Sequence, residues 1–117
     1  MLVVKPDPNN EQNSRKALNA FLDGVPCGLV RFHLNGYIIT VDELLPLPDD
    51  PKHMSADDYA ILDTEIRALG SYGLNHSCYY AVCEEPVLFE TLGALRFYQK
   101  DGVMKSDLSR MLSHGCG

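Results

Sequence analysis

The order of elements over residues 37–98 limits the fold more than any other feature of this sequence. The segment YIITVDELLPL (37–47) follows an Asn-Gly turn and predicts a strand, and a helical pattern comes after it. HSCYYAVC (76–83) is a nearly continuous apolar run of strand length, typical of a strand buried on both faces. A strand, a helix and a buried strand in succession predict a right-handed crossover with parallel pairing of the two strands.

The helix of this crossover is predicted over residues 56–69. Ser55 is a suitable N-cap, and Asp57 and Asp58 fall in the first turn, where the helix dipole favours negative charge. Gly70 and Gly73 are expected to end the helix in left-handed conformations. The apolar positions recur at helical spacing and form one stripe: Tyr59, Leu62, Ile66 and Leu69.

The first part of the chain predicts an antiparallel meander. Asp23-Gly24 and Asn35-Gly36 lie between runs of strand type, and such dipeptides are strong hairpin signals because type I′ turns need positive φ at both central residues. Residues 15–47 are therefore predicted to form three antiparallel strands. Residues 1–14 are expected to be a loose lead-in, and residues 106–117 a short helix and tail, within one domain that spans the chain.

Composition limits the function. At 117 residues with 45% hydrophobic and 22% charged residues, the chain predicts one soluble globular domain. A net charge of −6 excludes nonspecific nucleic-acid binding, which needs Lys and Arg against phosphates, and it disfavours an anionic membrane. No apolar run reaches the ~20 residues that cross a bilayer, and the N-terminus does not resemble a signal peptide. Four cysteines without a CxxC pair suit reduced thiols, so a cytoplasmic location is expected.

The second half of the chain resembles a known superfamily. Pro86 opens a short predicted helix, VLFETLG, and ALRFYQKDG (94–102) then predicts a strand. The segment LFETLGALRFY (88–98), together with the element order, resembles the Gcn5-related N-acetyltransferase (GNAT) superfamily. The resemblance implies an α+β fold with a mixed, mostly antiparallel sheet of five or six strands and a β-β-β-α-β-α-β core, as in acyl-CoA N-acyltransferases. A ferredoxin-like sandwich is the alternative fold.

The resemblance also implies a site for acetyl-CoA at the crossover. In the superfamily, a loop with a basic residue and two glycines before the helix binds the pyrophosphate. Here PDDPKHMSADDY (48–59) has no glycine and four acids, which repel a phosphate. A bulge and a splay of the two parallel strands are expected at VDELLPLP (41–48), where an acyl-CoA arm pairs with open backbone groups. The implied cofactor-binding residues are Leu44, Leu45, Leu47, Lys52, His53 and Ser55.

The catalytic residues implied by the resemblance are altered. Phe89 stands where the superfamily often has a tyrosine that protonates the departing thiolate, so Tyr98 is the candidate acid in its place. Glu43 is the candidate general base, and the alternatives are Asp42, His33 and His76. The helices that usually shape the acceptor site between the first two strands have no room in this chain.

Three functions follow from these patterns. The first is a divergent, acyl-CoA-dependent N-acetyltransferase that acts on a small amine. The second is a catalytically inactive GNAT-like module that binds a ligand or forms a homodimer through exposed apolar surface. The third is a metal or thiol site that involves Cys83, His114 and Cys116, whose side chains are ligands for zinc or copper, although no bound metal is expected.

Overall fold

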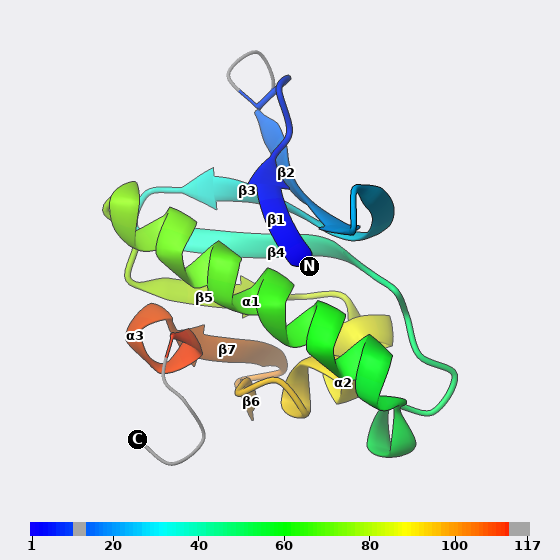
Figure 1. The fold of residues 1–117 in the computed structure, drawn as a ribbon. Helices are drawn as coiled ribbons and strands as arrows, with labels where there is room; N and C mark the ends of the chain where they lie inside the picture. The colour runs from blue at the N-terminus through cyan, green and yellow to red at the C-terminus, as the bar shows by residue number, and fades with distance from the viewer. Residues whose placement is uncertain (11–13, 113–117) are drawn as a thin grey trace.

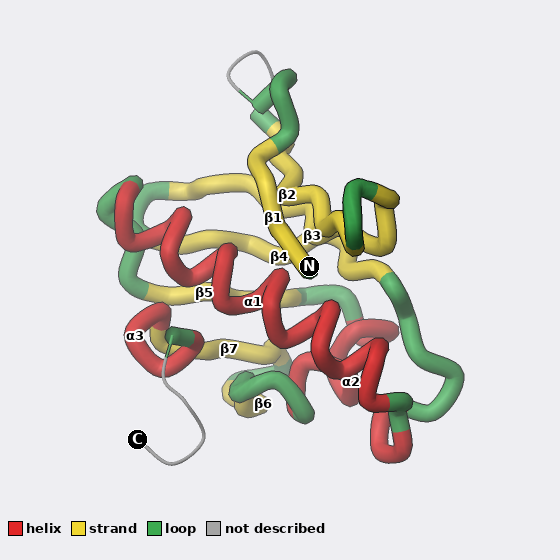
Figure 2. The backbone as a smooth tube through the Cα atoms, in the orientation of Figure 1, coloured by secondary structure: helices red, strands yellow, loops and turns green. Residues whose placement is uncertain are grey.

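The computed structural model describes residues 1–10 and 14–112. They form one seven-stranded sheet in the order β1-β2-β3-β4-β5-β7-β6, with helices packed against it (Figure 1, Figure 2). The strands are β1 Leu2–Pro6, β2 Arg15–Leu22, β3 Val25–Asn35, β4 Ile38–Leu45, β5 Tyr80–Cys83, β6 Tyr98–Lys100 and β7 Val103–Asp107. The helices are α1 Ala56–Asn75, α2 Phe89–Gly93 and α3 Leu108–Met111, with 3-10 turns η1 Pro51–His53 and η2 Pro86–Leu88.

The sheet confirms the predicted meander and crossover. Strands β2, β3 and β4 pair in antiparallel order, and β4 pairs with β5 in parallel through the connection that contains α1. The sheet has seven strands, whereas five or six were predicted. Residues 2–6, expected in a lead-in, form β1 beside β2, and residues 103–107 form β7 between β5 and β6. The hairpin from β6 to β7 turns at Asp101 and Gly102, which both have positive φ.

All three helices pack on the same face of the sheet. Buried side chains of α1, α2 and α3 form a single hydrophobic cluster with the inward-facing residues of the strands. Leu62 and Ile66 of α1 and Leu108 of α3 are fully buried in it. Figure 1 shows α1 crossing the sheet on this side, and among the described residues no helix packs on the opposite, helix-free face. No helix in the described part of the chain is long and apolar enough to cross a membrane.

Helix α1 extends six residues beyond the predicted end. Gly70 and Gly73 were expected to stop it, but both lie inside the helix. A Cβ atom on Gly73 would lie 2.4 Å from Ile39 Cδ1 and 2.6 Å from Leu108 Cδ1. Because Gly73 has no side chain, β4 and α3 can approach the helix closely at this point. This packing, and not the end of the helix, explains why position 73 is a glycine.

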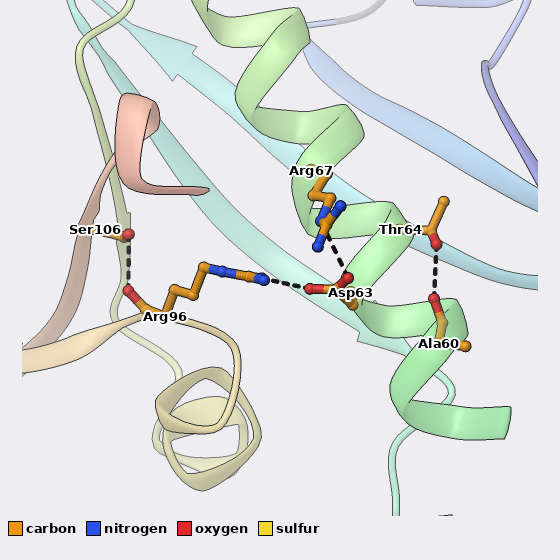
Figure 3. Close-up of polar contacts among 6 residues, drawn as sticks. All are labelled: Ala60, Asp63, Thr64, Arg67, Arg96 and Ser106. Carbon is orange, nitrogen blue, oxygen red and sulfur yellow. Dashed lines mark hydrogen bonds and ion pairs between the residues drawn. The ribbon is translucent and has the colours of Figure 1, made fainter. Parts of the chain in front are cut away.

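The segment that follows α2 is attached to α1 by charged groups. Arg96, with a φ of +77°, forms an ion pair with Asp63 of α1, and Arg67 Nε contacts the other Asp63 oxygen at 3.1 Å (Figure 3). The Arg96 carbonyl accepts a hydrogen bond of 2.9 Å from Ser106 Oγ of β7. These contacts connect the chain between α2 and β6 to both the helix layer and the sheet.

Candidate functional site

Strands β4 and β5 separate soon after they begin to pair. Their parallel register covers only Ile38–Thr40 opposite Tyr80–Val82, whereas β4 continues to Leu45. In the β3–β4 register, Arg31 is opposite Glu43 and Phe32 is opposite Val41, so Asp42 is an extra residue in β4. The bulge and splay predicted within residues 41–48 are thus present, and they open a gap in the sheet beyond Thr40.

The bulge directs two adjacent acids to the helix-free face. Asp42 Oδ2 lies 2.8 Å from His33 Nδ1, and Glu43 Oε1 accepts a hydrogen bond of 2.8 Å from Arg31 Nε. Arg31 and His33 are two residues apart in β3 and so share a face. Asp42 and Glu43 would alternate in a regular strand, and the extra residue places both on that face. Glu43, the candidate base, is therefore already ion-paired, with its side chain 49% exposed.

On the opposite side of the sheet, α1 places a carboxyl group in the core. Glu65 is fully buried, and neither carboxyl oxygen has a hydrogen-bond partner among the described residues. A Cβ on Gly28 would lie 2.4 Å from Glu65 Oε2 and 2.5 Å from the Leu45 carbonyl oxygen, so the glycine makes room for both groups. Burial raises the pKa of Glu65 to about 8. The side chain is therefore neutral at pH 7.

Sequence reasoning did not single out Glu65, although a signal was present. It comes three residues after Leu62 and four before Leu69, and therefore lies on the apolar stripe of α1. A charged residue at such a position is either paired, neutral or functional, because an ionised carboxylate in an apolar environment is costly. Gly28, in a strand where glycine weakens packing, was a second signal.

A shallow groove of about 300 Å³ lies between the loop after β4 and the start of α2. Thr91, at its floor, is fully buried, and its Oγ1 has no hydrogen-bond partner among the described residues. Two acids, Asp49 and Glu90, give the groove negative charge. Its lining consists of Leu47, Pro48, Asp49, Pro51, Pro86, Val87, Glu90 and Thr91.

Of the residues expected to bind a cofactor, Leu47 alone is among those that line this groove. Leu45 and Leu47 are exposed at the end of β4, and Leu47 lines the groove. The Leu44 side chain is buried in the core, which leaves its backbone for contact with a cofactor. Lys52 and His53 are exposed in η1. Ser55 caps α1, because its Oγ accepts a hydrogen bond of 3.1 Å from the Asp58 N–H.

The turn before α1 carries its own anion. Asp50 Oδ1 accepts the Lys52 N–H at 3.1 Å, and Asp50 Oδ2 lies 3.0 Å from His53 Nδ1. These are polar groups that a phosphate would otherwise contact. The acids of this loop were predicted to disfavour phosphate binding. Asp50 contributes to this effect because its carboxylate already contacts these polar groups.

The two positions considered for the acid are not brought to the bulge. Tyr98 lies in β6, and β7 separates that strand from β5. Strand β7 was not predicted from the sequence. Phe89, the first residue of α2, is partly buried against the hydrophobic core.

The metal candidates are not assembled in the described residues. Cys83 is fully buried at the end of β5, and burial, with smaller contributions from nearby carboxylates, raises the pKa of its thiol. His114 and Cys116 lie outside the described residues. Within the described ranges, no group of three or more His, Cys, Asp or Glu side chains is arranged to hold a metal ion.

Solved structures with the same architecture are N-acyltransferases. A putative acyl-CoA N-acyltransferase from Klebsiella pneumoniae superposes with a TM-score of 0.64 at 11% identity, over 92% of this chain and 98% of the other. An aminoglycoside 6′-acetyltransferase superposes with a TM-score of 0.60 at 11% sequence identity, over 86% of this chain and 73% of the other. The PaiA N-acetyltransferase of Thermoplasma acidophilum was solved with coenzyme A. It superposes with a TM-score of 0.60 at 12% sequence identity, over 85% of this chain and 64% of its own length.

These comparisons define the fold class. A mixed seven-stranded sheet whose one parallel pair is splayed is the architecture of acyl-CoA N-acyltransferases. The chain has the GNAT fold, in a divergent form, and the ferredoxin-like alternative is wrong. No family model and no curated protein matches the sequence.

Proposed function

We propose that this protein binds acyl-CoA at the splay of β4 and β5 and transfers the acyl group to a small amine. The observation that carries the proposal is the bulge at Asp42 next to a parallel pair that ends at Thr40 and Val82. A thioester arm in such a gap pairs with backbone groups of β4 that β5 leaves open, which requires no particular side chains. Structures with this fold include acetyltransferases solved with coenzyme A.

The residues around the gap fit the two ends of acyl-CoA unequally. Leu45 and Leu47 offer apolar contact to the pantetheine arm, and Lys52 and His53 supply the basic groups nearest to the start of α1. Asp50, Asp57 and Asp58 oppose the phosphates at the same place. We therefore expect binding that is weaker than a glycine-rich phosphate loop would give. A cytoplasmic location is part of this proposal, since acyl-CoA and reduced thiols are both available there.

A thermal-shift titration tests the proposal. Acetyl-CoA and free CoA should each raise the Tm in a saturable manner, because a ligand that binds only the native state stabilises it. ATP serves as a control for binding through phosphates alone and should give a smaller shift. An unchanged Tm at millimolar acetyl-CoA would contradict the proposal.

A second function, a non-catalytic module that acts as a homodimer, has one observation in its favour. The exposed aromatic side chains Tyr37, Tyr79 and Tyr80 lie close together at the start of β4 and β5, where the Tyr37 and Tyr79 ring centroids are 5.5 Å apart. Large exposed apolar side chains that cluster in this way are typical of interaction surfaces. This function predicts self-association without a response to acetyl-CoA.

A further inference from the structure

We propose that His33 is the general base of the acyl transfer and that Asp42 is the residue that positions it. The inference rests on the proposed function and names the groups that serve it. Both side chains lie on the helix-free face, and their connection is the 2.8 Å contact between His33 Nδ1 and Asp42 Oδ2. Neither side chain lines the groove between the loop after β4 and the start of α2.

The contact sets the tautomer of the imidazole. A carboxylate can only accept a hydrogen bond, so Nδ1 carries the hydrogen and Nε2 of the neutral ring keeps its lone pair. The imidazole is 37% exposed and the Asp42 side chain 18% exposed, which leaves the ring accessible and its partner mostly shielded. A histidine oriented by a carboxylate on one nitrogen, with the other nitrogen free, is the arrangement of a general base.

The position of the pair relative to the splay comes from the bulge. His33 is opposite Thr40, the last β4 residue that pairs with β5, and Asp42 is the extra residue two positions further. The pair therefore borders the gap in which we place the thioester.

The neighbouring acid is less suited to this role. Glu43 is held by Arg31 Nε in an exposed ion pair, so its carboxylate is already engaged. His33 is held by a carboxylate on Nδ1, which leaves Nε2 of the ring to accept a proton from the amine. An amine can approach His33 from the helix-free face, which no described helix covers.

The amine nitrogen attacks the thioester carbonyl carbon, a C–N bond forms, and the carbonyl electron pair moves to oxygen. His33 Nε2 accepts the proton that the nitrogen loses. When the carbonyl re-forms, the C–S bond breaks and the electron pair leaves on sulfur. The imidazolium then returns its proton to the thiolate, which yields the amide, free CoA thiol and the neutral base.

The first test reads the tautomer and needs no substrate. Two-bond 15N–1H correlation spectra should show His33 with hydrogen on Nδ1 in the wild type. In Asp42→Asn the amide can donate to Nδ1, so the hydrogen should move to Nε2. His76, whose Nδ1 contacts the Tyr72 carbonyl at 2.7 Å, should keep its signals in both proteins. An Nε2-protonated His33 in the wild type would overturn the proposal.

The second test measures aminolysis of acetyl-CoA by hydroxylamine, followed by loss of the thioester absorbance. His33→Gln and Asp42→Asn should each lower kcat by about 100-fold or more, with the KM for acetyl-CoA unchanged, as expected for loss of a general base. Asp101→Asn, in the exposed β6–β7 turn, is the matched control and should behave as the wild type. Wild-type kcat in His33→Gln, with wild-type binding of acetyl-CoA, overturns the role of His33 and leaves the proposed function standing. A wild-type protein that neither binds nor consumes acetyl-CoA overturns the proposed function itself.

Discussion

Glu65 makes the stability of this protein depend on pH. In the unfolded chain its carboxyl group ionises near the ordinary value of 4.5, whereas burial raises the pKa in the folded protein to about 8. The folded state therefore binds more protons between these values, and its free energy of unfolding should fall by about 1.4 kcal/mol per pH unit as the pH rises through this window. Above about pH 8 this contribution is lost and the curve should level. Urea unfolding across the window measures it, and Glu65→Gln should remove this slope.

The comparison needs a control variant that removes an exposed carboxyl group in place of a buried one. Glu84→Gln serves, because Glu84 is exposed after β5 and its replacement should leave the slope unchanged. Titratable groups near Glu65 include the Cys27 thiol, whose pKa is raised by burial and by Glu65. Parallel stability curves for the wild type and Glu65→Gln would mean that the carboxyl group is already ionised in the folded protein.

At the level of elements, α1 is fixed by what packs against it. Gly73→Ala should gain helix propensity of ~1 kcal/mol, yet the new methyl group would lie 2.4 Å from Ile39 Cδ1 and 2.6 Å from Leu108 Cδ1. Both neighbours are fully buried and have little room to move, so we expect a net loss of about 1–3 kcal/mol. Thermal or urea unfolding measures the change. Gly93→Ala, whose Cβ would lie 3.6 Å from Met104 Cε, is the control and should be neutral or stabilising. Equal effects of the two substitutions would contradict this explanation of Gly73.

The same elements show which parts of the fold could be predicted from the sequence. Asp23 and Gly24 both have positive φ and form the expected turn, so this part of the meander was predictable from local residues. The second turn lies one residue later than expected, at Gly36 and Tyr37, because Asn35 ends β3 and pairs with Ile38. Strand β1 depends on pairing with β2, and the end of α1 depends on contacts with β4 and α3, which local patterns do not contain. Asp101-Gly102 is a third dipeptide of this kind, with positive φ at both residues, but the strand that follows it, β7, was not predicted.

The candidate site was predictable in part for a related reason. The bulge at residues 41–48 followed from the resemblance and the prolines, and Glu43, Asp42 and His33 were all among the proposed bases. The sequence could not rank them, because only the register shows that Asp42 contacts His33 while Glu43 contacts Arg31. Glu65 and Thr91 are distinguished by burial without partners, a property of the tertiary structure.

For the whole molecule, the exposed tyrosines at the start of β4 and β5 and the net charge have opposite effects on self-association. The exposed tyrosines favour burial in a dimer, whereas a charge of −6 on each copy opposes it. If the homodimer forms, the dimer fraction in sedimentation should rise with concentration and with salt, since salt screens the repulsion. Tyr79→Ser should weaken it, and Tyr59→Ser, at an exposed position on α1, should not. Scattering should then give a radius of gyration that exceeds the 13.2 Å of the single chain's Cα atoms as concentration rises. A constant monomer at all salt concentrations would exclude the dimerisation function, and the acyl-transfer proposal would stand alone.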